Sequence, residues 1–187
     1  MIVFAIVLLV LGAWAVMIFN GLVALRNQVS NAFRQIDVQL KRRHDLIPNL
    51  VESVKGEMKF EKETLERVIQ ARAAAVSAGQ GGNMSEVLAK EGVLTQALGR
   101  LMAISENYPN LKANESVKTL MEELTHTENQ IGFSRQLYND EATKFNTRQQ
   151  VFPTNLFAAM LGFSVSALWE LPSDSPEREN VKVSLKV

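Results

Sequence analysis

Residues 114–152, NESVKTLMEELTHTENQIGFSRQLYNDEATKFNTRQQVF, carry a single apolar stripe over a long run. The apolar positions recur three, four or seven residues apart, which is the pattern of one face of an α-helix. Asn114 is a typical N-cap residue, and Pro153 ends the pattern because proline cannot continue a helix. Such a helix would be about 58 Å long. It can bury its apolar face only against other long helices, so we expect an all-α fold, an elongated antiparallel helical bundle.

Two further stretches on the amino-terminal side show the same helical periodicity. One runs from Leu22 to Met58, and the other runs from Val87 to Ile104. Pro48 interrupts the first stretch, so we expect either a kink or a restart of the helix with Asp45 as its N-cap. The topology stays open, because residues 20–77 either oppose the later helices in series or fold back at Pro48.

A glycine-rich segment, SAGQGGNMS at residues 77–85, separates these two stretches and predicts a loop. Ser85 is the expected cap of the helix that follows. A glycine loop that binds phosphate follows a β-strand, and no strand-like run precedes this segment. Nucleotide binding is therefore not expected here.

The first 19 residues, MIVFAIVLLVLGAWAVMIF, contain no charged side chain, and the first charge of the chain is Arg26. As a helix this segment would be about 28 Å long, which is enough to cross a bilayer. The alternative is a cleaved signal peptide, with Ala13-Trp14-Ala15 as the cleavage site. No Lys or Arg precedes the run, and apolar residues continue past that site. We therefore expect a retained transmembrane anchor at residues 1–20.

Basic residues flank only the carboxyl side of this anchor, at Arg26, Arg34 and the triplet 41–43. The positive-inside rule then predicts a single-pass membrane protein with a short amino end outside and its body in the cytoplasm. The reverse orientation stays open, because the triplet lies about twenty residues beyond the span, at the edge of the window in which the rule applies.

Residues 156–171, LFAAMLGFSVSALWEL, are apolar but are interrupted by Gly162 and by serines. The segment is too short and too mixed for a second membrane span. We expect a helix that caps the bundle. The alternative is an interfacial helix that returns to the bilayer, although such helices usually carry flanking Lys and Arg.

The chain therefore divides into an anchor at 1–20, a helical bundle at 21–171 and a tail at 172–187. In the tail, apolar and polar residues alternate from Val181 to Val187, which predicts a short β-strand. An all-helical body offers this strand no sheet edge. The strand is therefore expected to dock in a groove, to pair with another subunit or to stay loose.

The composition and motifs exclude several classes of function. The 187 residues include 20 Lys and Arg, 20 Asp and Glu, and no Cys. Without cysteine there is no thiolate metal site or thiol nucleophile, and the balanced charge argues against a nucleic-acid partner. The two histidines, His44 and His126, lack nearby carboxylates in the sequence patterns of a zinc site or a catalytic base. We expect no catalytic, cofactor-binding or metal-binding residue, and no cofactor.

Polar residues lie beside the apolar stripes of the first and third long helices. Such residues can form buried hydrogen bonds between helices, because an unpaired buried polar group costs about 1–3 kcal/mol. We expect a structural network that fixes the helix register. The alternative is a charged functional site formed by the Asp, Glu and Arg residues at 37, 42, 45, 128 and 135. The predicted network comprises Asp37, Arg42, Arg43, Asp45 and Asn49 on the first helix and Glu128, Asn129, Arg135, Asn139 and Asn146 on the third.

Five motifs follow the anchor in a fixed order. They are IDVQLKRRHDLIPNLVESVKG (36–56), ENYPNLKA (106–113), THTENQIGFSRQLYND (125–140), KFNTRQQVFP (144–153) and LGF (161–163). Together they resemble the LemA family of bacterial membrane proteins over roughly residues 20–165. The resemblance implies a membrane-anchored helical bundle with its body in the cytoplasm, at the bacterial inner membrane, and no established enzymatic activity. Related proteins include a magnetosome-membrane member, and family genes often lie near genes for membrane metalloproteases.

Two functions from different classes fit these features. The first is a structural or interaction protein, a membrane-tethered coiled rod that self-associates as a scaffold or recruits partners. Its partners would be the lipid bilayer, further copies of the same chain in a homo-oligomer and a membrane protein. The second is an enzyme or a regulatory subunit of an enzyme, such as an adaptor of a membrane metalloprotease in envelope quality control.

Overall fold

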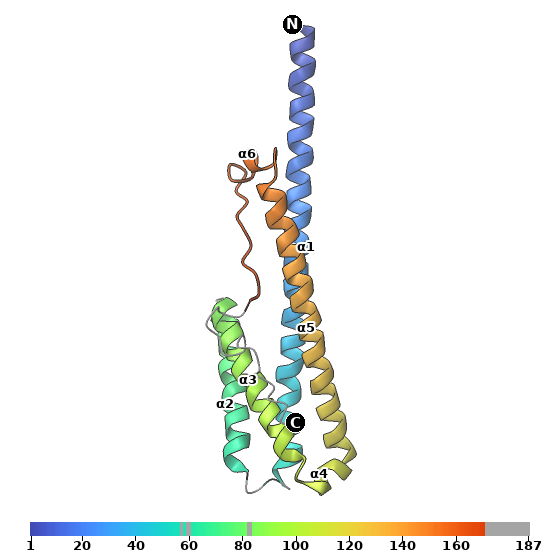
Figure 1. The fold of residues 1–187 in the computed structure, drawn as a ribbon, viewed down its shortest axis with the longest axis vertical. Coiled ribbons are helices and arrows are strands. Elements are labelled where there is room, and N and C mark those ends of the chain that lie inside the picture. The colour runs from blue at the N-terminus through green and yellow to red at the C-terminus, as the bar shows by residue number, and fades with distance from the viewer. Residues whose placement is uncertain (57, 59–60, 82–83, 171–187) are drawn as a thin grey trace, which may run out of the picture. The chain divides into compact units, whose positions relative to one another are not determined.

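The computed structural model describes residues 1–56, 58, 61–81 and 84–170. Every regular element within these residues is a helix, as Figure 1 shows, and this confirms the all-α prediction. The helices are α1 (Ile2–Lys55), α2 (Lys62–Gly81), α3 (Met84–Ser105), α4 (Pro109–Ala113), α5 (Glu115–Gln150) and α6 (Asn155–Ala158).

The chain forms two compact units, each built from segments that are far apart in the sequence. The first unit combines residues 1–40 with 128–168, and the second combines residues 41–127 with 169–187, described as far as residue 170. Both α1 and α5 contribute to each unit. Residue 20, taken from the sequence as the end of the anchor, lies inside α1, so the apolar segment continues into the bundle without a break.

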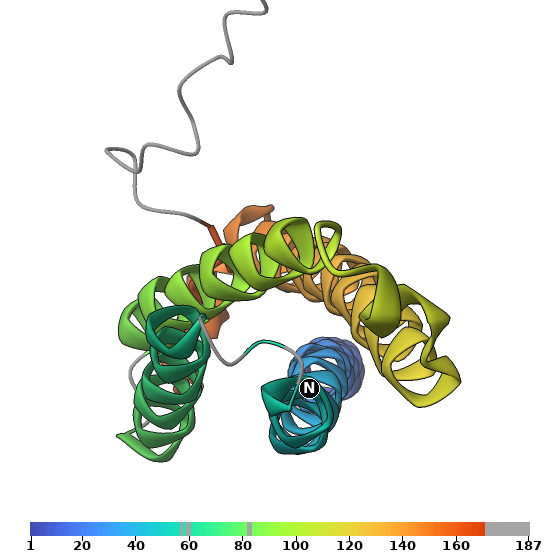
Figure 2. The same ribbon diagram turned by 90° about the horizontal axis from the view of Figure 1, so that it is seen from below.

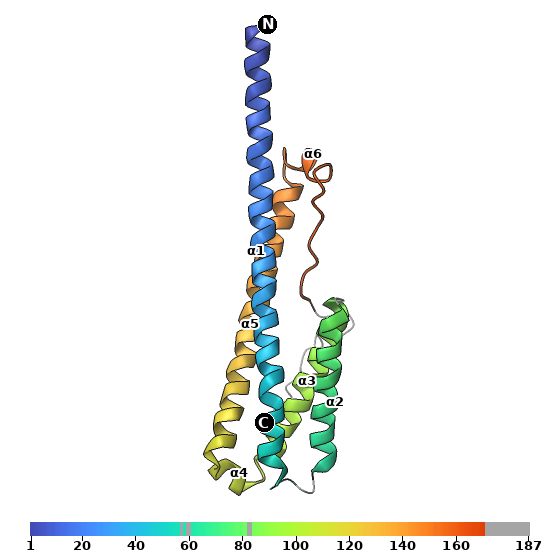
Figure 3. The same ribbon diagram turned by 180° about the vertical axis from the view of Figure 1, so that it is seen from behind.

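In the first unit, the part of α1 that follows its exposed start, from Ile18 to residue 40, lies antiparallel to the second half of α5 (Figure 1 and, from behind, Figure 3). Leu22 and Ile36 of α1 are buried here, as are Ala142 and Phe145 of α5. These side chains belong to the stripes that the sequence predicts, so the helical periodicity identifies the packed faces. On the amino-terminal side of Ile18, every side chain of α1 is exposed.

The second unit has its own hydrophobic core. Seen end-on in Figure 2, α2, α3 and the beginning of α5 form an arc, and the last part of α1 lies on its concave side. Each helix buries one apolar stripe toward the others, which is the packing expected of a helical bundle. The most deeply buried core residues are Ile47, Leu50, Val54, Met58, Val68, Ala75, Leu94, Leu101, Leu111, Val117 and Leu124.

Pro48 does not end the first helix. α1 continues through Pro48 to Lys55, so a restart of the helix with Asp45 as N-cap is a wrong prediction. Proline inside a helix destabilises the fold by about 3 kcal/mol, but full burial of each large aliphatic side chain stabilises it by about 1.5–3 kcal/mol. Ile47 and Leu50, on either side of the proline, are both fully buried, and Pro48 itself is exposed.

The glycine-rich segment is more helical than its composition predicts. α2 extends to Gly81 and α3 begins at Met84, so Ser85 lies inside the first turn of α3 and the prediction that it caps the helix is wrong. Ala75 and Ala78 are buried, and packing of these small side chains holds the end of α2 in helical form.

The predicted cap of the long third helix is confirmed. The side-chain oxygen Oδ1 of Asn114 accepts hydrogen bonds from the backbone N–H groups of Ser116 and Val117, at 3.1 and 3.3 Å. It thereby satisfies two of the donors that every helix leaves unpaired at its start. The structure adds the short helix α4 before this cap, with Pro109 in its first turn, where the missing N–H of proline costs nothing.

The prediction of a capping helix at residues 156–171 is wrong. α6 has only four residues, and the helical turn ends at Gly162, which has a φ of 76°. The N–H of Phe163 donates to the carbonyl of Ala158 at 3.0 Å, and that of Gly162 donates to Ala159 at 3.1 Å. This pair of bonds is a Schellman motif, which requires a left-handed residue at its end, and glycine supplies it without strain. Residues 163–170 then form an extended segment, and the predicted strand in the tail lies outside the described residues.

Candidate functional site

A buried ion pair joins α1 to α3 inside the second unit. The guanidinium group of Arg43 donates to Oε2 of Glu91, and the two residues are only 1% and 7% exposed. A second nitrogen of Arg43, Nη1, donates to Oγ1 of Thr95 at 3.0 Å. Because a buried charge is tolerated only when it is paired and hydrogen-bonded, this arrangement accounts for an arginine in the core.

His44 completes this cluster. Its Nε2 lies 2.8 Å from Oε1 of Glu91, so both carboxylate oxygens have a partner. The carboxylate beside His44 comes from another helix, and the sequence patterns around the histidine do not indicate it. Nε of Arg72, on α2, donates to the carbonyl oxygen of His44 at 2.6 Å. The cluster therefore connects three helices, α1, α2 and α3.

Both members of the ion pair occupy positions at which the helical stripes would otherwise carry apolar residues. Arg43 lies three residues after Leu40 and four before Ile47, and Glu91 lies three residues before Leu94. A charged residue at such a position meets its counter-ion in only one register of the two helices. Glu91 is not among the residues of the predicted network, but this interruption of the stripe is the signal that identifies it.

The carboxyl group of Glu91 is held in its ionised form. Burial raises its pKa, but the hydrogen bond with His44 and the charge of Arg43 together outweigh burial and lower the pKa below its ordinary value of 4.5. An ionised carboxylate with both oxygens occupied has no proton to donate near neutral pH and no free oxygen for a substrate. The geometry therefore supports a structural lock between helices.

A separate groove of about 460 Å³ runs between α2 and α3. Its lining includes the small residues Ala71 and Ala97 and the cations Arg67, Lys90 and Arg100. Neither Arg43 nor Glu91 contributes to it, so the groove gives no access to the ion pair. In the part of the chain that the structure describes, no group of three or more His, Cys, Asp and Glu residues is placed to hold a metal ion.

A second polar arrangement, in the first unit, fastens the extended segment to α5. The side-chain amide of Asn146 donates to the carbonyl oxygen of Ser166 at 2.9 Å and accepts from the N–H of Ser166 at 2.8 Å. The hydroxyl of Tyr138 donates to the carbonyl of Ala167 at 2.7 Å. These side chains provide the backbone of an extended segment with partners that a neighbouring strand would otherwise supply.

Aromatic rings continue this contact along α1. The ring of Phe163 lies 5.7 Å from that of Phe19 and 6.2 Å from that of Phe145, and the guanidinium carbon of Arg26 lies 5.5 Å from its centre. Phe163 is buried, so its ring fixes the position at which the extended segment begins.

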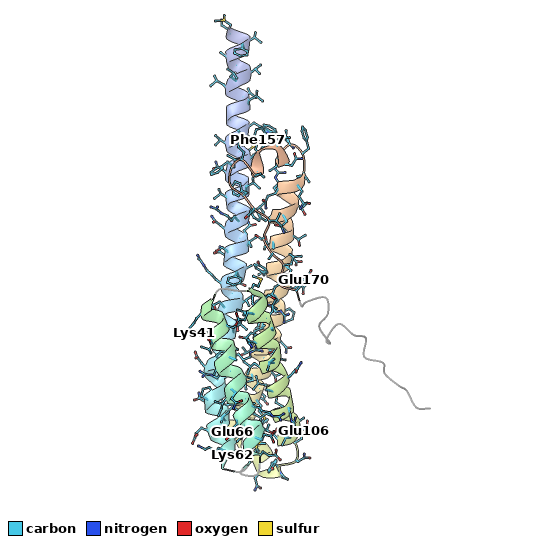
Figure 4. All side chains as sticks on the ribbon, turned by 90° about the vertical axis from the view of Figure 1, so that its left-hand side faces the viewer. Lys41, Lys62, Glu66, Glu106, Phe157 and Glu170 are labelled. Atoms are coloured by element: carbon cyan, nitrogen blue, oxygen red, sulfur yellow. The ribbon has the colours of Figure 1, made fainter. Side chains whose placement is uncertain are left out.

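One further aromatic contact lies toward the amino end of α1. The ring centres of Trp14 and Phe157 are 6.3 Å apart and the rings meet edge to face. In Figure 4 the labelled Phe157 lies in the turn beside α1. The turn that contains α6 is therefore attached to the apolar part of α1.

The ten residues of the predicted network fall in both units. Arg43 and Asn146 have the partners described above, and Arg42 forms a more exposed ion pair with Glu123 of α5 at 2.5 Å. Exposed polar groups are satisfied by water and need no partner from another helix, whereas for the half-buried residues the network stays a prediction. The exposed residues are Asp37, Asp45, Asn49 and Asn129, and the half-buried ones include Glu128, Arg135 and Asn139.

The sequence is similar to magnetosome MamQ proteins and to a LemA protein, at 26–29% identity. It is 26% identical to magnetosome protein MamQ of Magnetospirillum gryphiswaldense, over 84% of this chain and 67% of that protein. It is also 26% identical to a MamQ of Paramagnetospirillum magneticum, over 81% of this chain, and spans only 64% of that relative's length. Protein LemA of Metamycoplasma hominis is 29% identical, with 86% of this chain and 75% of that protein covered.

The family model extends further along the chain than the five motifs indicate. It matches residues 32–185 and so includes the tail, whereas the motifs reach only to about residue 165. The match begins after the apolar start of α1, within the helix that carries Arg43. With most of its length matched, the chain belongs to the LemA family.

Proposed function

We propose that this chain is a membrane-tethered interaction protein, which acts by binding other protein chains at the membrane and not by catalysis. The observation that carries the proposal is the first part of α1. Its most apolar 18-residue window has a mean hydropathy of 3.0, and only 6% of that window is buried within the chain. A core helix of a soluble protein would be mostly buried, so we expect this exposed apolar surface of α1 to lie in a bilayer.

The location that fits best is the inner membrane of a bacterium. The basic residues Arg26, Arg34 and Lys41 follow the apolar segment. Under the positive-inside rule this distribution favours a short amino end outside and the body in the cytoplasm. The family and its magnetosome relatives agree with a membrane-associated protein.

The polar sites favour binding over catalysis. The carboxylate of Glu91 is saturated by Arg43 and His44, and the amide of Asn146 is saturated by backbone. Both arrangements stabilise helix packing, and none of their side chains lines the groove between α2 and α3.

The surface that we assign to self-association lies on α5. Phe133 is 67% exposed and Leu137, one turn later, is 39% exposed. Large apolar side chains grouped on an otherwise polar helix are typical of a contact surface for another protein. A second copy is the occupant that we propose, because a shared membrane tether raises the local concentration of identical chains.

Photo-crosslinking in intact membranes tests this proposal. A benzoylphenylalanine is placed at Phe133, and in a matched control at Thr143, an exposed polar position of the same helix that lies about 80° away from Phe133 around the helix axis. The proposal predicts crosslinks between copies of the chain from position 133 and far fewer from position 143. Equal yields from both positions would contradict a specific surface.

The same experiment separates the proposal from the adaptor function. If position 133 crosslinks mainly to one different membrane protein, the self-associating scaffold is wrong and the chain is an adaptor, whose process the partner would identify. Recovery of the chain and its crosslinks in the soluble fraction, and not with the membranes, would contradict membrane tethering.

A further inference from the structure

The turn between α5 and the extended segment carries an apolar surface that nothing in the first unit covers. Phe152 is 78% exposed, Leu156 is 58% exposed and Met160 is 79% exposed. No charged side chain occurs between Arg148 and Glu170. A water-facing turn of a soluble domain would be polar, so this composition requires an apolar environment.

The contacts of the turn with α1 give its level along the anchor. Phe157 packs on Trp14, which lies twelve residues before Arg26, or about 18 Å along the helix at the usual rise. If the bilayer core covers the first 30 Å of α1, Trp14 lies about 10 Å inside the boundary that faces the body. The contact with Trp14 therefore holds the turn at a depth where lipid surrounds the anchor.

The other end of the turn marks the membrane surface. Phe163 lies under the guanidinium of Arg26, the first charge of the chain, at 5.5 Å, and it also contacts Phe19. An arginine that follows an apolar helix is typically found at the level of the lipid headgroups, with aromatic rings beside it. The chain thus descends from headgroup level at Phe163 to the level of Trp14 at Phe157.

We propose that residues 152–162, which we name the α6 turn, insert into the boundary between headgroups and acyl chains beside α1, as a second membrane contact of the chain. The inserted apolar side chains would be Phe152, Leu156, Met160 and Leu161. A depth of about 5–10 Å is usual for segments that lie in this boundary. The Schellman motif at Gly162 turns the backbone back toward the body and satisfies the end of the turn internally, as burial in lipid requires.

This inference rests on the proposed membrane tether, because the depth of the α6 turn is measured from α1. Lipid is the partner that the observations favour, since any molecule that covers the turn at the level of Trp14 must itself lie in the bilayer. The turn has no charged side chain that would select a polar protein surface.

The full chain has no cysteine, so single cysteines report single positions. Met160→Cys, Leu8→Cys and Asp140→Cys variants are each labelled with an environment-sensitive fluorophore and placed in vesicles of phosphatidylethanolamine and phosphatidylglycerol. Quenching is measured with lipids brominated near the headgroup or deep in the acyl chain. We expect the probe at 160 to be quenched several-fold more than the probe at 140, mainly by the shallow bromines, and the probe at 8, inside the bilayer core, to be quenched as well.

The three positions distinguish failure of this inference from failure of the tether. If the probe at 160 behaves like that at 140 while the probe at 8 is quenched, the α6 turn is outside the lipid and the inference is wrong, but the tether stands. If the probe at 160 is shielded from water yet not quenched by lipid, a protein covers the turn and the inference is also wrong. If the probe at 8 is not quenched, the tether itself fails. A Leu156→Cys variant repeats the measurement at a second exposed position.

Discussion

The side chain of Asn146 binds the backbone of Ser166 in both directions, donating to its carbonyl oxygen and accepting from its N–H. The side chain of one helix residue thus provides the hydrogen-bond donor and acceptor that a paired strand would provide in a sheet. Because the segment leads back from the α6 turn, this contact helps to set how far the turn reaches along α1.

Replacing Asn146 should release the extended segment. In an Asn146→Ala variant both backbone groups of Ser166 lose their partner, and we expect the free energy of unfolding to fall by about 1–3 kcal/mol. Hydrogen exchange, followed by mass spectrometry on the chain in lipid nanodiscs, should show faster exchange at residues 164–168. An Asn146→Asp variant keeps the acceptor for the N–H of Ser166 and should retain part of the protection. Unchanged exchange in the Ala variant would mean that other contacts hold the segment.

The ion pair between Arg43 and Glu91 should be strongly coupled. Glu91→Ala leaves the guanidinium of Arg43 buried without a counter-ion, and we expect a loss of about 3–5 kcal/mol in stability. Combining it with Arg43→Met should restore most of that loss, because an apolar pair needs no counter-charge. Urea unfolding of the single and double variants gives the coupling energy.

The exposed Asp37 is the matched control for this cycle. Asp37→Asn should change the free energy of unfolding by no more than about 0.5 kcal/mol, since surface substitutions rarely exceed that. Additive effects of the Arg43 and Glu91 substitutions, or a loss at Asp37 as large as that at Glu91, would argue against the lock.

Glu91 should also make the stability depend on pH on the acid side. Its pKa in the folded chain lies below the ordinary value of 4.5, so its stabilising effect is fully present above 4.5 and is lost as the pH falls through the lower folded value. A Glu91→Gln variant has no carboxyl group at this position and therefore lacks this pH-dependent stabilisation. Its stability should therefore fall less steeply than that of the parent chain between about pH 5 and about pH 3, in unfolding curves measured at closely spaced pH values. Parallel curves would show that Glu91 is not ionised preferentially in the folded state.

The cap at Asn114 should contribute a modest and specific amount. Asn114→Ala removes the acceptor for the N–H groups of Ser116 and Val117, which should cost about 0.5–2 kcal/mol. Asn114→Gly should cost only a few tenths of a kcal/mol, because glycine is itself tolerated at a helix start. Thermal unfolding of the two variants, measured side by side, checks this order of stability. An Ala variant that is more stable than the Gly variant would contradict the capping role.

The long helices could be predicted from sequence because their stripes are regular. The stripe and cap of α5 identify its start and end within a few residues, and the apolar run at the amino end identifies the exposed part of α1. Pro48 and the glycines near residue 81 misled the prediction, because tertiary packing of Ile47, Leu50 and Ala78 outweighs local propensity.

The polar site could be predicted only in part. Arg43 was identified by its type and position, but its partner Glu91 is 48 residues away, and only the packing of α1 on α3 brings the two together. The role of Asn146 depends on an extended backbone at Ser166, which the apolar composition of residues 156–171 suggested would be helical. The signal that breaks that helix is Gly162, whose left-handed conformation becomes evident only from the hydrogen bonds around it.

The central claim is that the apolar start of α1 remains on the chain and holds it in the membrane. The most direct measurement is intact mass spectrometry of the protein recovered from carbonate-washed membranes. Retention of the anchor predicts that the expressed chain is recovered in the washed membrane fraction with residues 1–20 still attached. A shorter chain cleaved after Ala15, or full-length chain found only in the carbonate supernatant, would contradict it.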